Sequence, residues 1–124
     1  MAEGQQRLQA LSEEYTSLQQ ELQTNVASRQ KLESQQQENK GVQKEFKSLD
    51  DDANIYKLVG PVLLKQDKTE AVLAVDGRLE FIDNEIKRVE KQIKEIEEKT
   101  DKVRMEIMQI QSESQAAAQP QAAA

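Results

Sequence analysis

Acidic residues in the middle of the chain are the first candidates for chemistry. Asp50, Asp52 and Asn54 have the spacing of positions 1, 3 and 5 of a calcium-binding loop, whose oxygen atoms coordinate the ion. The match then fails, because Ile55 stands where the loop needs a glycine and Pro61 stands where it needs a bidentate glutamate. We therefore interpret these acids as a helix stop and a solvated junction, and we expect no metal site.

Other chemistry is limited by residue types that the sequence lacks. The 124 residues include no His and no Cys, which removes imidazole acid–base catalysis, thiol nucleophiles, disulfides and the usual zinc ligands. No glycine-rich phosphate loop precedes a helix, and no pair of carboxylates is placed in a plausible cleft. We expect no catalytic residue and no cofactor, and we do not expect an enzyme.

The composition is that of an elongated helical protein. Apolar residues make up 36% of the chain, aromatic residues 3% and charged residues 32%, which favours a coiled coil over a large globular core. A net charge of −6 and the scarcity of aromatic rings argue against nucleic acid as a partner. The N-terminal stretch lacks the pattern of a secretory signal and no apolar run is long enough to span a bilayer, so we expect a cytoplasmic protein without a membrane partner.

A first long helix is predicted over residues 5–50, which contain no proline. Its apolar residues follow the alternating spacing of three and four that marks a coiled-coil seam. The seam becomes polar in the middle and is predicted to resume after a register break of three residues. The apolar positions before the break are Leu8, Leu11, Tyr15, Leu18 and Leu22, and those after it are Leu32, Val42, Phe46 and Leu49.

A second helix is predicted over residues 68–113, with a heptad seam interrupted only by Thr100. Asp67 and Glu70 have the spacing of a capping box at its start. Its seam positions are Val72, Val75, Leu79, Ile82, Ile86, Val89, Ile93, Ile96, Val103, Ile107 and Ile110.

The two helices have matched lengths, which predicts that they fold back on each other as an antiparallel coiled-coil hairpin. The alternative is that each helix pairs only with helices of other chains. Residues 114–124 are low in complexity, contain Pro120 and carry no large apolar residue, so we predict a disordered tail.

A β-hairpin is predicted over residues 54–67, where two short apolar runs flank Gly60 and Pro61. With a two-residue loop the strands are Ile55–Val59 and Val62–Gln66, and a shift by one residue would exchange their faces. Both faces are mostly apolar and a lone hairpin is marginal in water, so we expect it to join a sheet made by several subunits. The alternative is that it folds back on the helix ends. The predicted assembly residues are Ile55, Tyr56, Leu58, Val59, Val62, Leu63 and Leu64.

The order of a long polar helix, the segment YKLVGPVLLKQD and a capped helix that opens KTEAVLAVDGRLEFIDNEI resembles the β-type subunits of prefoldin. The resemblance extends from Leu8 to Ile110. It implies a hetero-hexamer of two α-type and four β-type subunits, in which each β-type subunit gives one hairpin to a central double β-barrel. It also implies an ATP-independent chaperone that holds unfolded proteins, notably actin and tubulin, and passes them to the cytosolic group II chaperonin.

The helix ends far from the hairpin are the predicted client-binding region, because helix ends fray and methionine adapts to varied apolar partners. The alternative is that most of these residues are ordinary seam positions. A competing function is a structural adaptor or tether that assembles through its β-hairpin. The predicted client-binding residues are Leu8, Leu11, Val103, Met105, Ile107, Met108 and Ile110.

Overall fold

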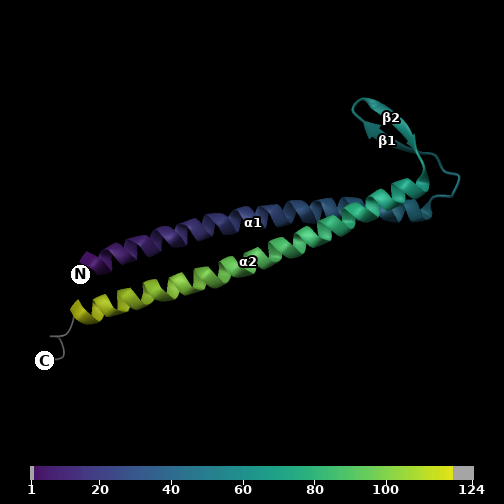
Figure 1. Cartoon of the computed structure of the whole chain (residues 1–124). Helices are drawn as coiled ribbons and strands as arrows, with labels where there is room; N and C mark the ends of the chain where they lie inside the picture. Colours follow the sequence, from purple (N-terminus) through teal and green to yellow (C-terminus); the bar gives the residue numbers. More distant parts are fainter. Residues whose placement is uncertain (1, 119–124) are drawn as a thin grey trace. The chain divides into compact units, whose positions relative to one another are not determined.

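A computed structural model describes residues 2–118 of the chain (Figure 1). These residues form two long helices, with an antiparallel pair of strands between them in the sequence. In chain order the elements are α1 (Ala2–Ser48), β1 (Ile55–Val59), β2 (Val62–Gln66) and α2 (Lys68–Ala118). The mostly helical fold predicted from the sequence is confirmed, as are the bounds of both strands.

The helix bounds differ from the predicted ones at three places. Helix α1 begins at Ala2 and ends at Ser48, and α2 continues to Ala118. The prediction of a tail without structure from residue 114 is therefore wrong for residues 114–118, where three alanines, the best helix formers, extend the last turns. The rest of the predicted tail, residues 119–124, lies outside the described residues.

The chain forms two compact units. The hairpin unit is Ser28–Val89, and the terminal unit combines Met1–Ala27 with Glu90–Ala124. The terminal unit has a small apolar core in which α1 and α2 pack side by side, as the heptad pattern predicts. Its buried members are Leu11, Leu18, Ile96 and Val103, with Tyr15, Leu22, Ile107 and Ile110 partly buried against them.

The hairpin unit has an unequal seam, apolar on α2 and largely polar on α1. Helix α2 buries Ala71, Val75, Leu79, Ile82 and Val89 there. On α1, the Gln36 amide donates a hydrogen bond to Asp83 Oδ1 at 2.6 Å. Gln43, which lies seven residues after Gln36 on α1, donates a hydrogen bond to Asp76 Oδ1 at 2.9 Å. Asp76 lies seven residues before Asp83 on α2. The order of these contacts shows that the helices run antiparallel in this unit.

The predicted register break in α1 is wrong. Val42 is 40% exposed, whereas its neighbour Gln43 is half-buried and contacts α2. A side chain that contacts the opposite helix occupies the seam whether it is polar or apolar, so counting only apolar residues produced a false offset. Twelve of the less exposed positions keep one heptad spacing: Leu8, Leu11, Tyr15, Leu18, Leu22, Asn25, Arg29, Leu32, Gln36, Asn39, Gln43 and Phe46.

Replacing Gln43 with leucine is expected to stabilise the chain. Gln43 lines a small groove of about 240 Å³ beside Phe46 and Val72, where a leucine side chain would add apolar contact. Asp76 is exposed, so its freed carboxylate regains water at little cost. We expect a gain of about 1 kcal/mol from the added apolar burial, measured by urea unfolding.

Gln37→Leu is the matched control, because Gln37 is exposed on the same helix. This substitution is expected to change stability by less than about 0.5 kcal/mol. A loss of stability in Gln43→Leu would show that the amide–carboxylate hydrogen bond outweighs the apolar contact.

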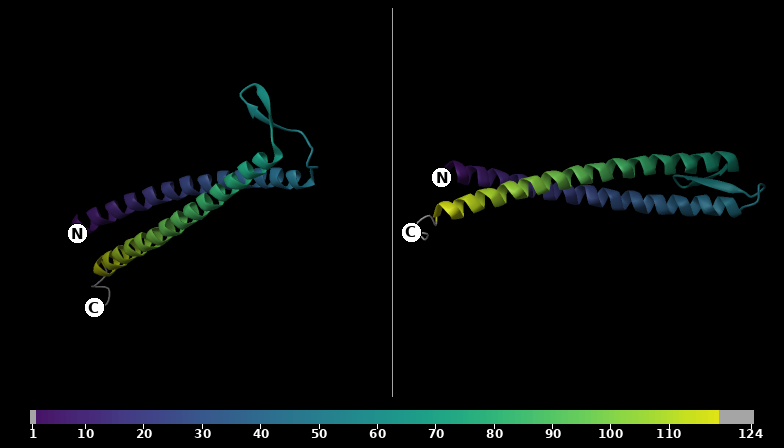
Figure 2. Two further views of the ribbon diagram at one scale, coloured as in Figure 1. Left: turned by 45° about the vertical axis from the view of Figure 1, so that its right-hand side comes forward. Right: turned by 90° about the horizontal axis from the view of Figure 1, so that it is seen from below.

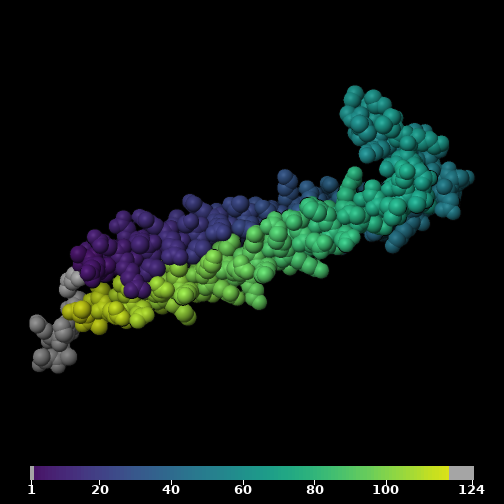
Figure 3. Space-filling model, viewed as in Figure 1, coloured from purple at the N-terminus to yellow at the C-terminus, as the bar shows by residue number. Residues whose placement is uncertain are grey.

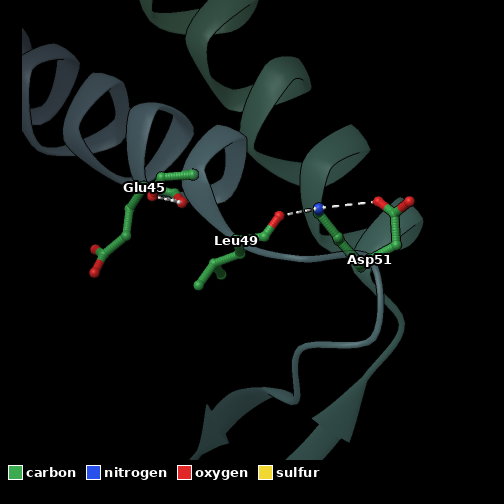
Figure 4. Close-up of polar contacts among 5 residues, drawn as sticks. Glu45, Leu49 and Asp51 are labelled. Carbon is green, nitrogen blue, oxygen red and sulfur yellow. Dashed lines mark hydrogen bonds and ion pairs between the residues drawn. The ribbon is translucent and has the colours of Figure 1, made fainter.

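Lys68 joins the end of α1 to the start of α2. Its Nζ donates a hydrogen bond to the Leu49 carbonyl at 2.8 Å and lies 3.3 Å from Asp51 Oδ1 (Figure 4). The last carbonyls of a helix have no partner within the helix and attract a cation, so this contact satisfies the end of α1. Asp51 therefore takes part in the junction between the two helices.

The β-hairpin has the register of a two-residue loop. Leu58 pairs with Leu63 and Val59 with Val62, directly around Gly60 and Pro61. Gly60 has a φ of 58°, which glycine adopts without strain, and proline restricts the next residue to negative φ. This combination fits a type II′ turn and excludes type I′, which needs positive φ at both positions.

Candidate binding surfaces

The β-hairpin exposes apolar side chains on both of its faces. Leu58, at 69% exposed, and Leu63, at 63%, lie opposite each other on one face together with Tyr56. Val59, Val62 and Leu64 are about half exposed on the other face. In the hairpin unit, the strands stand away from the helices and point back along α2 (Figures 1 and 2). Neither face of the hairpin is therefore covered by the rest of this unit.

Six of the seven predicted assembly residues are exposed in this way. Ile55 is the exception, because it is only 8% exposed. It begins β1 at the base of the hairpin, where a buried side chain anchors the strand to its own chain. Ile55 is therefore buried within the subunit, and the exposed apolar surface of the hairpin consists of Tyr56, Leu58, Val59, Val62, Leu63 and Leu64.

The backbone of the hairpin also offers edges for pairing. The sheet contains β1 and β2 alone, so each strand pairs on one side and has an open edge on the other. Open edges with apolar side chains add further strands readily, because the unpaired N–H and C=O groups gain partners. The space-filling view shows the hairpin protruding from the hairpin unit, accessible to another chain (Figure 3).

A second apolar surface lies on α2 in the terminal unit. Met105 is 68% exposed and Met108 is 61% exposed. Residues three apart share a face of a helix, so the two thioethers form one patch on the side away from the core. Leu8 and Ile110 instead line a groove of about 660 Å³ between the start of α1 and the end of α2.

The predicted client-binding residues are thus divided between surface and interior. Leu11 and Val103 are 8% and 5% exposed and belong to the core of the terminal unit. Ile107 is partly buried against the same core. The residues of this set that remain accessible are Met105 and Met108, with partial access to Leu8, Ile107 and Ile110.

Two exposed apolar residues of the hairpin unit were not among the binding residues predicted from the sequence. Leu73 is 66% exposed and Phe81 is 65% exposed on α2. Neither occupies a seam position, and large apolar residues outside the heptad seam are a signal of a binding surface. The same reasoning identified the methionines, so it could have found these residues as well.

Glu85 and Arg88 form an ion pair within α2. The pKa of Glu85 lies below its ordinary value because Arg88 donates hydrogen bonds to its carboxylate, the shortest at 2.8 Å, and attracts it electrostatically. Both side chains are on the surface of one helix, three residues apart. Residues 2–118 contain no group of three or more acidic, His or Cys side chains arranged to hold a metal ion. None of the helices described is long and apolar enough to span a bilayer.

These features define a class of protein: a helical coiled coil that carries an exposed apolar β-hairpin for contact with other chains. Residues 9–114 match the sequence profile of a family described as "Prefoldin subunit". The chain belongs to the prefoldin subunit family. This family is not a class of enzymes, and membership implies assembly with other prefoldin subunits.

Individual relatives agree with this assignment. Prefoldin subunit 6 of Saccharomyces cerevisiae is 45% identical over 100 residues, covering 81% of this chain and 88% of that protein. Prefoldin subunit 6 of Homo sapiens is 41% identical over 113 residues, covering 91% and 88%. Among solved structures, the prefoldin beta subunit from Thermococcus strain KS-1 superimposes with a TM-score of 0.78 at 32% identity, covering 82% of this chain and 90% of that one.

Proposed function

We propose that this chain is one subunit of an ATP-independent holding chaperone, a prefoldin hetero-hexamer of two α-type and four β-type subunits. The observation that carries the proposal is the exposure of Met105 and Met108 in a protein that also exposes an apolar hairpin. A tether needs the hairpin but gains nothing from exposed methionines. A chaperone needs both, because one surface assembles the complex and another holds unfolded chains.

Assembly proceeds through the β-hairpin. Its open edges accept strands from neighbouring subunits, and closure into a central β-barrel buries apolar faces that water now contacts. In such a barrel one face of the hairpin points into the interior. The other face points outward, where it can contact other parts of the complex. This accounts for apolar side chains on both faces, which a hairpin at the surface of a monomer would not carry.

Unfolded proteins are held at the ends of the helices in the terminal unit. The patch of Met105 and Met108 offers flexible, polarisable contacts that suit many apolar sequences. The groove between Leu8 and Ile110 accepts a further side chain of the bound protein. Each contact is weak, but several subunits bind one unfolded chain at the same time. The overall affinity for that chain is therefore much higher than the affinity of a single contact.

The proposed clients and the proposed place of action are supported by membership of the prefoldin subunit family. We propose that newly made actin and tubulin are among the bound proteins, and that the complex delivers them to the cytosolic group II chaperonin in the cytoplasm. A holding function needs no ATP, because weak apolar contacts release a client as soon as a partner offers a better surface.

Replacing Met105, Ile107, Met108 and Ile110 with serine is expected to weaken client capture without preventing assembly. The assembled complex containing the variant should need about tenfold higher concentration to suppress aggregation of a refolding client, since each lost apolar contact costs binding free energy. Light scattering of refolding actin, without ATP, measures this effect.

The simpler variant Met105→Ser with Met108→Ser separates client binding from stability. Both residues are exposed, so helix content and native mass of the complex should not change. Unchanged protection of the client by this pair and by the fourfold variant would discard the terminal unit as the client-binding region.

A further inference from the structure

Leu73 and Phe81 form an apolar patch on α2 that the heptad seam does not explain. Helical spacing puts Leu73, Ala74, Gly77 and Phe81 on one face, from the second to the fourth turn of α2. The face presents two large side chains, each about two-thirds exposed, with the small residues between them. Ala74, Gly77 and Phe81 also line a groove of about 640 Å³ against Gln35 and Asn39 of α1.

Gly77 adds an independent observation. Glycine in the middle of a helix costs stability relative to alanine. A Cβ atom built at Gly77 would meet no atom within 4 Å, so the packing of this chain does not require glycine there. A glycine between two exposed apolar residues permits another backbone or side chain to approach the helix closely. Gly77 is therefore compatible with the close approach of another chain at this position.

The size of the hairpin requires a further contact surface. A stable interface uses about 20–30 residues on each side and buries about 800 Å² per partner. The strands β1 and β2 contain five residues each, and Ile55 is already buried in its own chain. The size of the hairpin therefore favours an interface with neighbouring subunits that extends beyond the strands. In the hairpin unit outside the strands, the large apolar residues exposed to a similar degree are Leu73 and Phe81.

Charge identifies the kind of segment that fits the patch. Glu70 precedes Ala74 by one helical turn and Glu80 follows Gly77 by one turn, and both are exposed beside the patch. Arg78 lies on the side of the patch next to α1. The charged residues of the strands are both lysines, Lys57 and Lys65. A neighbouring hairpin of the same composition would complement an apolar patch with glutamates at its rim.

We propose that Leu73, Ala74, Gly77 and Phe81 form a second assembly surface, which receives the β-hairpin of a neighbouring prefoldin subunit. This inference rests on the proposed function, because it extends the contact made by the hairpin onto α2. A leucine or valine of the neighbouring hairpin sits over Gly77 between Leu73 and Phe81. A neighbouring hairpin that carries lysines, as this chain's hairpin does, would place them near Glu70 and Glu80.

Replacing Leu73 and Phe81 with glutamine tests the patch. Both side chains are exposed and glutamine is a good helix former, so the isolated chain should keep its helix content and melting temperature. Its dissociation constant from the complex with its partner subunits should rise about tenfold or more, measured by native mass spectrometry on dilution. The matched control is Met105→Gln with Met108→Gln, which changes side chains of similar exposure and should assemble normally.

Substitutions at Gly77 test close approach directly. Gly77→Ala and Gly77→Gln should both raise the melting temperature of the isolated chain, since nothing obstructs a side chain there. Gly77→Gln should nevertheless weaken assembly, because its longer side chain occupies the space that the neighbour needs. If Gly77→Gln and the Leu73, Phe81 variant both assemble with wild-type affinity, the proposal is wrong.

A variant of the hairpin separates this inference from the proposed function. Leu58→Ser with Leu63→Ser should prevent assembly whether or not the α2 patch is an interface. If the hairpin variant assembles normally, the proposed assembly surface is itself wrong. If the hairpin variant fails while the Leu73, Phe81 variant assembles normally and captures less client, the patch binds clients and the further inference is overturned.

Discussion

Replacing both Leu58 and Leu63 with serine is expected to leave the isolated chain folded and to abolish its incorporation into the complex. The two side chains lie opposite each other in the hairpin and are 69% and 63% exposed, so their loss costs the isolated chain little. Once buried between subunits, each leucine is worth about 2–5 kcal/mol relative to a truncated side chain. The pair should therefore weaken association by roughly a thousandfold or more.

Native mass spectrometry of the chain mixed with its partner subunits measures this loss, and circular dichroism verifies that the helices remain. The control is Met105→Ser with Met108→Ser, in which two equally exposed apolar residues of the terminal unit are changed. That variant should enter the complex normally and fail in client capture. Equal assembly of the hairpin variant and the wild type would show that the hairpin is not the principal contact between subunits.

Truncating Ile96 to alanine is expected to have the largest effect on the stability of the chain itself. Ile96 is 4% exposed in the core of the terminal unit, packed with Leu11, Leu18 and Val103. A cavity left by isoleucine in such a core costs about 2–4 kcal/mol. Because small domains are stable by only about 5–15 kcal/mol, the melting temperature should fall by roughly 10 °C or more.

Urea unfolding followed by circular dichroism measures this change in free energy. Ile96→Val should cost only about 1 kcal/mol, since it removes one methylene group. Met105→Ala, at a residue 68% exposed, should change stability by less than about 0.5 kcal/mol. If Ile96→Ala were no more harmful than Met105→Ala, the small core would not be what holds the two helices together in this unit.

These two experiments separate the parts of the protein that are stable alone from the parts that need a partner. Ile96 is buried by its own chain, whereas Leu58 and Leu63 are exposed to water in the chain alone. The same distinction divides α2: Leu79 contributes to the seam, and Phe81, two residues later, does not. A chain that assembles and then holds unfolded proteins needs both kinds of apolar residue.

Local pattern determined much of the fold. The strands Ile55–Val59 and Val62–Gln66 and the start of α2 at Lys68 were predicted from the sequence, because turn residues, capping residues and short apolar runs act over a few neighbouring positions. The α2 seam was predicted for the same reason. The seam positions of α2 are apolar at almost every turn. The side of α2 that faces α1 can therefore be identified from the sequence of α2 alone.

Only the tertiary structure decided which side chains are covered. In α1 the sequence favoured Val42 as a seam residue, but the opposing face of α2 selects Gln43, whose amide reaches Asp76. Burial of Ile55 and exposure of Phe81 were likewise not evident from residue type. The periodicity of a sequence indicates which residues share a face of a helix. Whether that face is buried depends on the surface that packs against it, and this surface comes from a distant part of the chain.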